Sequence, residues 1–294
     1  MGQDACKMLN EAIQRQPKKL NIKVVAILND TTGTLVKGAY DDPRTCIGLI
    51  LGTGCNGAYL ESADKVLNWV GDKKNAQEVI IDPEWGAFGD NGCIDFIKTS
   101  VDQELDMASL LPKSFTYEKY FAGKYLGEIV RLCLVHLHDL KAFMPENDLE
   151  FEATLKAKDA FTTQMVSQVI EKDANFEELK IIFKEEFGEE FGMKLTENDL
   201  KILTHVCNVL SERGALLVAI PMAVFIERMP QKEHVAIAIT GSLYKCHPKM
   251  KALLEMHIKK IVPGRSFHTF LSDDGSGKGA GLVAAIAARL ASAQ

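Results

Sequence analysis

Residues 22–61 read IKVVAILNDTTGTLVKGAYDDPRTCIGLILGTGCNGAYLE, and the other features of the chain are organised around this stretch. Its first apolar run, residues 22–28, has the length of a buried strand and leads into Asn29 and Asp30. A second apolar run leads into the glycine turn of residues 52–54. A carboxylate at one strand end can accept a proton, and a glycine turn at the next can hold phosphate. The stretch therefore indicates a phosphoryl-transfer site.

The composition is that of an ordinary globular protein: 294 residues with 47% hydrophobic content give a sizeable core. A formal net charge of −6 argues against a nucleic-acid partner, because neutralising phosphates requires a concentrated basic face. The seven cysteines include no Cys-x-x-Cys pair, which indicates reduced thiols in the cytosol rather than disulfides or a zinc site. The apolar stretch 215–226 is interrupted by Pro221 and is too short for a bilayer, so we expect no transmembrane segment.

The order of the expected elements indicates an α/β fold. We expect strands over residues 22–28, 47–51, 58–61, 234–240 and 266–271. We expect helices over residues 1–16, 30–38, 117–138, 147–230, 248–260 and from 279 to the end. Within 171–200, ten acidic residues outnumber four lysines, while Phe183, Phe187 and Phe191 recur at helical spacing. A core stripe beneath a solvated acidic face explains both patterns.

The glycines of the second turn allow more than one interpretation. Gly52-x-Gly54-x-x-Gly57 has the spacing of a dinucleotide-binding fingerprint, but that fingerprint requires a helix to begin there. A third strand over 58–61 makes a hairpin turn the better prediction. The Thr53 hydroxyl and consecutive N–H groups could cradle an anion, and a simple tight hairpin explains the glycines equally well.

A later glycine-rich run, residues 275–279, is not a Walker A phosphate loop. Ser272 stands where the first glycine is required, and Gly279 follows Lys278 where Ser or Thr is required. We therefore interpret the run as the lead-in to a helix, whose N-terminus is favourable for anions.

Several polar residues are candidates for chemistry, and each also has an ordinary structural explanation. Asp30 could simply cap a helix; in a phosphotransferase it would accept the proton of the attacking hydroxyl. Carboxylates and amides that each bind one or two hydroxyl groups suit a polyol, which groups Asn29, Asp30, Asn56, Glu84 and Glu118. Their spacing does not require them to converge, and exposed surface positions are the usual outcome. Companion ligands at zinc spacing are lacking for His136, His138 and His205.

Taken together, the ordered motifs resemble the eukaryotic hexokinase family of the actin-like ATPase superfamily. They lie in residues 24–34, 47–56, 84–89, 117–128, 241–248 and 275–280. The resemblance implies a ribonuclease H-like large lobe with an extensive helical insertion. It divides the chain into a small-lobe helix (1–21), the large lobe (22–273) and a C-terminal helix returning towards the small lobe (274–294).

The same resemblance assigns roles to the candidate residues. It implies that Asp30 is the catalytic base for the sugar 6-hydroxyl, and that glucose or a related hexose is held by Asn29, Asp30, Asn56, Glu84 and Glu118. It places the phosphates and ATP next to Gly52, Thr53, Gly54, Gly123, Lys124, Gly241 and Ser242. Mg²⁺ would arrive with ATP, held through phosphates and water rather than by a protein cage. The implied activity is ATP-dependent phosphorylation of glucose, the first step of glycolysis, in the cytosol.

The chain also departs from the family pattern. A first phosphate loop of the Asp-x-Gly-Gly-Thr type, a Ser-Phe-Pro segment and a Thr-Lys pair are not found in the sequence. The resemblance therefore implies that most of the small lobe is missing, and we expect this polypeptide alone to be weakly active or inactive. Exposed apolar faces on the small-lobe remnants would favour self-association. The alternative function is a non-catalytic sugar-binding or regulatory protein.

Overall fold

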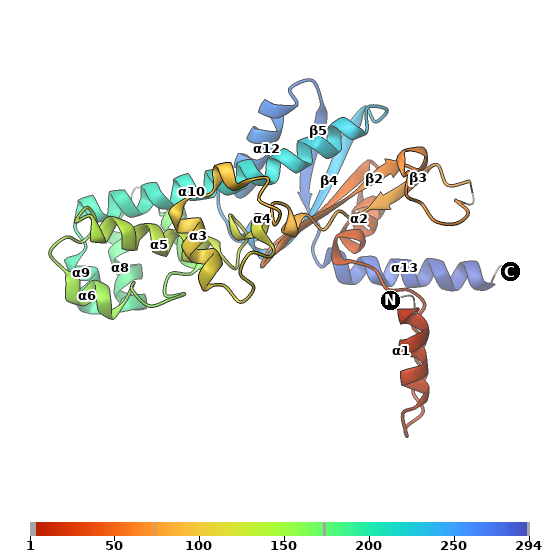
Figure 1. The fold of residues 1–294 in the computed structure, drawn as a ribbon, viewed down its shortest axis with the longest axis horizontal. Coiled ribbons are helices and arrows are strands. Elements are labelled where there is room, and N and C mark those ends of the chain that lie inside the picture. Colours follow the sequence, from red (N-terminus) through yellow and green to blue (C-terminus); the bar gives the residue numbers. More distant parts are fainter. Residues whose placement is uncertain (1–3, 74, 173–174, 293–294) are drawn as a thin grey trace.

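The computed structural model describes residues 4–73, 75–172 and 175–292. A five-stranded mixed sheet lies at the centre of the molecule, with an extended helical region on one side of it (Figure 1). The strands lie in the order β3-β2-β1-β4-β5. Their bounds are Thr45–Leu51 (β1), Cys55–Ser62 (β2), Glu78–Ile81 (β3), His234–Thr240 (β4) and Ser266–Leu271 (β5). The α/β class predicted from the sequence is confirmed.

The sheet combines antiparallel and parallel strand pairs. β1 and β2 are antiparallel, with Leu51 opposite Cys55, so residues 52–54 form the loop of a hairpin. This confirms the hairpin and rules out a Rossmann turn. β1 pairs with β4 in parallel, and β4 pairs with β5 in parallel. Because parallel strands are covered on both faces, β4 is an almost continuous buried apolar run.

Two helices cross closely beside the sheet. Gly48 in β1 lets α2 (Asp30–Asp41) approach, because a Cβ there would lie 2.6 Å from the Thr31 carbonyl oxygen. α13 (Gly275–Ser292) packs on α2, and a Cβ on Gly279 would clash with the carbonyl of Gly33. The positions of α2 and α13 are therefore linked through glycine contacts.

The helical region follows β3 and returns to the sheet through one long helix (Figure 1). The remaining helices are α1 (Ala5–Gln14), α3 (Ser100–Ala108), α4 (Thr116–Lys119), α5 (Leu126–Asp139), α6 (Asp148–Ala153), α7 (Thr163–Glu171), α8 (Phe176–Phe187), α9 (Glu189–Lys194), α10 (Glu197–Arg228), α11 (Ser242–Cys246) and α12 (Met250–Ile261). The phenylalanine stripe lies on α8 and α9: Phe183 and Phe191 are buried, and the Phe187 ring contacts both.

α10 is the one helix in the described part of the chain that is long and apolar enough to cross a membrane. However, 61% of its most apolar window is buried inside the protein, as in the core helix of a soluble fold. Pro221 lies within it and cannot donate a hydrogen bond to the Leu217 carbonyl one turn earlier. The Tyr117 hydroxyl donates to that carbonyl instead, at 2.6 Å. This contact connects α10 to α4.

Two expected elements are wrong. Residues 22–28 form no strand, and Ile22 and Ile27 are 60% and 55% exposed. The run is apolar, but a strand also requires a neighbour; here the Asn10 side chain takes that role by bonding both the N–H and the C=O of Val24. The single helix expected over 117–138 is interrupted between α4 and α5. Gly123 donates its N–H to the Gly52 carbonyl at 2.7 Å, which holds this segment against the hairpin loop.

Candidate functional site

A cleft of about 420 Å³ opens where β1 and β4 end and α2 begins. It brings together all of the predicted sugar ligands and most of the predicted phosphate-binding residues. Its lining consists of Asn29, Asp30, Ile50, Gly52, Thr53, Gly54, Cys55, Asn56, Glu84, Gly86, Phe115, Glu118, Thr240, Gly241, Ser242 and Ser276.

The N-terminus of α2 separates the capping residue from the candidate base. Asn29 is the N-cap: its Oδ1 accepts from the Thr31 N–H at 2.8 Å and from the Thr31 hydroxyl at 2.6 Å. Asp30 is the first helical residue, is exposed and lines the cleft. Capping therefore accounts for Asn29 and does not account for Asp30.

Glu84 is held in place from both sides. The Nδ2 of Asn29 donates to Glu84 Oε1 at 2.6 Å, and the Glu84 N–H points to Asp82 Oδ1 at 3.4 Å. The Glu84 backbone is left-handed, with φ 51° and ψ 52°, which is uncommon for a residue with a side chain. Burial raises the pKa of the Glu84 carboxyl, and the charges of Asp82 and Asp30 add to this effect. The Glu84 carboxylate is thus held in one orientation in the cleft, and its negative charge is poorly compensated.

Asp82 also connects Glu84 to Asn56. The Asn56 Nδ2 donates to Asp82 Oδ1 at 2.8 Å, while Asn56 Oδ1 accepts from the Gly57 N–H. Asp82 was not among the residues predicted from the sequence, and its only sequence signal is its position two residues before Glu84. It joins the hairpin strand β2 to the Glu84 loop.

Glu118 forms another wall of the cleft and is flanked by glycines. Its Oε2 accepts from the Cys55 N–H at 3.2 Å. A Cβ on Gly54 or Gly86 would lie 2.8 Å or 3.1 Å from the same oxygen, so both glycines leave room for this carboxylate. Burial raises the pKa of Glu118, opposed by the Cys55 hydrogen bond and by the charges of Lys124 and Lys119.

The hairpin loop is braced from behind. The Gly52 N–H donates to the Gly54 carbonyl within the loop. Gly123 and Lys124 donate their backbone N–H groups to Gly52 and Thr53. These two residues do not line the cleft, and the Lys124 ammonium lies 5.4 Å from the centre of the Tyr125 ring. The structure therefore gives them a supporting position, and their proximity to ATP stays a prediction.

The opposite side of the cleft is lined by hydroxyl groups and backbone. Gly241 has φ 138°, a conformation that favours glycine, and a Cβ there would clash with the Leu51 carbonyl. Thr240, Ser242 and Ser276 join it in the lining. Sequence analysis did not assign Thr240 and Ser276 to the site, although Thr240 directly precedes Gly241 and Ser276 lies within the glycine-rich run 275–279. The cleft therefore has a carboxylate and amide side that suits hydroxyl groups, and a hydroxyl and N–H side that suits phosphate.

A family model described as hexokinase matches residues 46–286, and a second hexokinase model matches residues 1–40. Human hexokinase-3 is 37% identical over 296 residues, covering 99% of this chain and 31% of that protein. Human hexokinase-1 is 36% identical over 295 residues, again covering 99% and 31%. The chain thus spans about a third of the length of these curated relatives.

Solved structures similar to this chain are also hexokinases. A hexokinase from Schistosoma mansoni complexed with glucose has a TM-score of 0.84 and 34% identity, covering 96% of this chain and 61% of that one. A second hexokinase crystal structure has a TM-score of 0.78 and 26% identity, covering 95% and 58%.

Proposed function

We propose, because this chain belongs to the hexokinase family, that its cleft binds a hexose and ATP and transfers a phosphoryl group to the sugar 6-hydroxyl. The observation that carries the proposal is the convergence of the five predicted sugar ligands in one cleft, next to the hairpin loop. Apart from the adjacent Asn29 and Asp30, they are separated by 26 residues or more in the chain, so only the fold could bring them together.

The carboxylate side of the cleft is suited to a sugar. Glu84 and Glu118 can accept hydrogen bonds from hydroxyl groups, and Asn29 and Asn56 can also donate. Hydrogen bonds to a charged acceptor are the stronger ones, so the two carboxylates should supply most of the affinity. The Schistosoma mansoni relative was solved with glucose, which supports glucose as the hexose.

Asp30 is suited to act as the base. It is exposed in the cleft at the start of α2, where its carboxylate is free from capping. As the 6-hydroxyl oxygen attacks the terminal phosphorus of ATP, Asp30 would accept the hydroxyl proton and ADP would leave. Activation of this hydroxyl is the step that loss of Asp30 should stop.

The hydroxyl and N–H side of the cleft fits nucleotide phosphates. ATP with Mg²⁺ would supply the transferable phosphoryl group, and Thr53 and Ser242, which line the cleft, would donate their hydroxyls to phosphate oxygens. In the described ranges, no group of three or more His, Cys, Asp or Glu side chains could hold a metal ion. Mg²⁺ would be held through the ATP phosphates and water.

Glucose titration tests sugar binding directly. The chain has two tryptophans, and Trp85 follows Glu84 while Trp69 lies elsewhere. In the Trp69→Phe variant, Trp85 fluorescence should change on adding glucose, and this change should be lost in Trp69→Phe/Glu118→Ala. Glucose-dependent ADP release in a coupled assay then tests transfer. We expect this release to be slow, because the Asp-x-Gly-Gly-Thr phosphate loop is not found in the sequence, and Asp30→Asn should abolish it while retaining the fluorescence response. No glucose response in the first variant would refute the sugar site.

A second function is favoured by one observation. In the described part of the chain, no Lys or Arg side chain lines the cleft, although phosphoryl transfer generally uses cations to stabilise the developing charge. A non-catalytic sugar-binding protein would need none. Glucose binding with no ADP release, and equal glucose affinity in the parent and Asp30→Ala, would support this second function.

The metabolic pathway and the cellular location are also part of the proposal. We place the reaction in glycolysis and the protein in the cytosol, which fits the seven cysteines, all free in the structure.

A further inference from the structure

Asp82 lies just outside the cleft, directly after β3 ends at Ile81. It is half-buried and is not one of the residues that line the cleft. Its Oδ1 nevertheless accepts hydrogen bonds from two residues that do line it, from the Asn56 Nδ2 at 2.8 Å and from the Glu84 N–H at 3.4 Å. One carboxylate oxygen therefore connects two of the proposed sugar ligands from outside the cleft.

The pairing of β2 with β3 brings Asp82 to Asn56. Tyr59 of β2 pairs with Ile81 of β3 in an antiparallel register. Continuing this register by one residue places Asp82 opposite Ala58, and Asn56 is then its diagonal neighbour on the same face of the sheet. The contact between Asp82 and Asn56 is therefore a consequence of the strand register.

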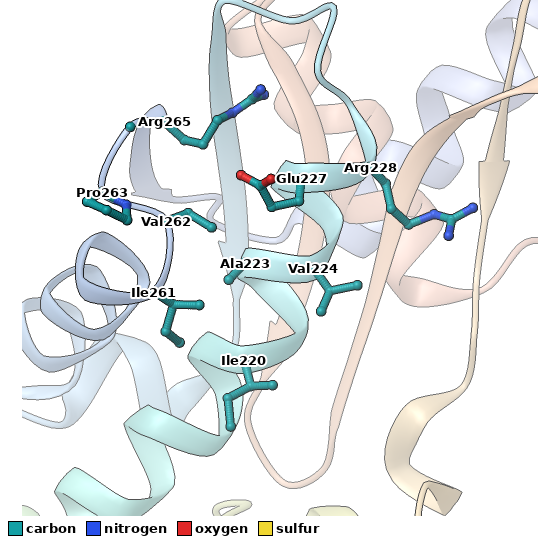
Figure 2. A pocket seen from close by; sticks show the side chains of 10 residues that line it. Ile220, Ala223, Val224, Glu227, Arg228, Ile261, Val262, Pro263 and Arg265 are labelled. Atoms are coloured by element: carbon teal, nitrogen blue, oxygen red, sulfur yellow. The ribbon is translucent and has the colours of Figure 1, made fainter.

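The other end of this strand pair is anchored by α10. Arg228, at the end of α10, donates through Nε to Glu61 Oε2 at 2.6 Å, and Glu61 pairs with Val79 of β3. Figure 2 shows the Arg228 side chain extending away from Glu227 and Arg265, with which it lines a groove between α10 and the loop after α12. Asp82 thus continues from an anchored pair of strands, which suits a residue that orients others.

We propose that Asp82 is a positioning residue of the sugar site, which fixes the amide orientation of Asn56 and the backbone turn at Glu84. This proposal rests on the hexose site proposed above. A carboxylate only accepts hydrogen bonds, so the Asn56 Nδ2 must face Asp82, while Asn56 Oδ1 accepts from the Gly57 N–H at 2.8 Å. The amide is therefore held in one orientation, which leaves its second Nδ2 hydrogen for a sugar hydroxyl.

The turn at Glu84 depends on the same carboxylate oxygen. The bond from the Glu84 N–H to Asp82 Oδ1 closes an Asx turn around Pro83. Glu84 has a φ of 51°, a conformation that a residue with a side chain keeps only where its surroundings hold it. Asp82 holds the Glu84 backbone, and Asn29 holds its carboxylate through Oε1.

The charge of Asp82 also acts on Glu84. Burial is the main cause of the raised pKa of Glu84, and the Asp82 charge adds to it. The other charged groups that face Glu84 are Asp30 at the start of α2 and, in the same cleft, Glu118 of α4. The hydrogen bond from Asn29 opposes the rise. Removing the Asp82 charge should therefore lower the pKa of Glu84 and keep it an acceptor down to a lower pH.

Two substitutions at Asp82 separate hydrogen bonding from charge. Asp82→Ala removes both, whereas Asp82→Asn keeps an acceptor oxygen. In the Trp69→Phe background at pH 8, we expect Asp82→Ala to weaken glucose binding about tenfold and Asp82→Asn to recover most of this loss. The fall in affinity on acidification should begin at a lower pH in Asp82→Asn than in the parent. Asp64→Ala, at an exposed acid outside the cleft, should match the parent throughout.

Nuclear magnetic resonance without sugar keeps this test separate from the proposed function. The Asn56 side-chain amide and the Glu84 carboxyl can be assigned from Asn56→Ala and Glu84→Gln. Asp82→Ala should move the Asn56 amide signals towards those of an exposed asparagine, and Asp82→Asn should lower the Glu84 pKa. No glucose response in the parent would refute the sugar site itself.

Three results would overturn the role of Asp82 in a parent that does bind glucose. They are an unchanged glucose affinity in Asp82→Ala, unshifted Asn56 amide signals in that variant, and an acid dependence in Asp82→Asn that coincides with that of the parent. Circular dichroism should show the same helix content in both variants, so that a loss of affinity reports on the site rather than on the fold.

Discussion

Asn29 Nδ2 donates a hydrogen bond to Glu84 Oε1 at 2.6 Å, although 55 residues separate them in the chain. Two proposed sugar ligands are therefore bonded to each other. A hydroxyl group placed between them can accept from Asn29 and donate to Glu84, so one direct bond becomes two. The direct bond fixes the two side chains relative to each other.

We predict that Glu84→Gln weakens glucose binding tenfold or more, because a hydrogen bond to a charged acceptor contributes about 1.5–3 kcal/mol. Fluorescence titration of the Trp69→Phe protein measures this. The raised pKa of Glu84 also gives a direction with pH. Affinity should fall on acidification at a higher pH than an ordinary carboxyl would cause, and this dependence should be weaker in Glu84→Gln. Glu171→Gln, at an exposed acid outside the cleft, should behave like the parent.

Gly54→Ala should reduce glucose affinity while the protein stays folded. The added Cβ would lie 2.8 Å from Glu118 Oε2, and the carboxylate is the part that can move. Glu118 would then leave the position in which it accepts from the Cys55 N–H. Gly281→Ala is the control, since a Cβ there meets no atom within 4 Å. Unchanged affinity in Gly54→Ala would argue against Glu118 as a sugar ligand.

Tyr117→Phe should lower the free energy of unfolding by about 1–3 kcal/mol, because the buried Leu217 carbonyl loses its donor. The Pro221→Ala background restores a backbone N–H at the position that normally donates to that carbonyl. Tyr117→Phe should therefore cost less in that background. Urea unfolding of the parent, the two single variants and the double variant measures this difference in a double-mutant cycle. Equal costs in both backgrounds would show that the tyrosine does not compensate for the proline.

His247 should make the protein sensitive to acid. Burial lowers the pKa of His247 to about 4, while an unfolded histidine titrates near pH 6.5. Between these values the unfolded chain binds the proton and the folded chain does not, so stability present above about pH 6.5 is lost as the pH falls. The full effect is about 3 kcal/mol.

Chemical unfolding between pH 7 and pH 4 would show the His247 contribution. In the fold, His247 Nε2 lies 2.9 Å from the Ser211 hydroxyl, and its Nδ1 accepts from the Lys249 N–H. His247→Gln should be less stable at pH 7 but should lose less stability on acidification. Parallel pH curves for the parent and the variant would contradict this prediction.

The fold was predictable where local pattern and tertiary partner agree. β4 and β5 are short apolar runs between turns, and the structure has them at the predicted residues. Residues 22–28 have the same pattern but no neighbouring strand in the described chain, and the pattern carries no information about the neighbour. The interruption before α5 was missed because a contact 71 residues away, between Gly123 and Gly52, decides it.

The residue types of the site could be predicted from the sequence, but the hydrogen bonds that connect its residues could not. Asp30 and Glu84 stood out as acids in distinctive contexts. Asp82 did not, because its importance comes from accepting the Asn56 amide across 26 residues. Lys124 has a further role that its motif does not indicate: its backbone N–H supports the hairpin loop by donating to Thr53. Long-range hydrogen bonds of this kind leave no signal in local sequence.

The extended run of residues 19–29 leads directly into the candidate base. It spans up to about 36 Å and ends at Asn29, the N-cap directly before Asp30. Along this run the Asn10 side chain bonds both the N–H and the C=O of Val24. The segment that enters the cleft at Asn29 is therefore tethered to α1, which contributes no residue to the cleft lining.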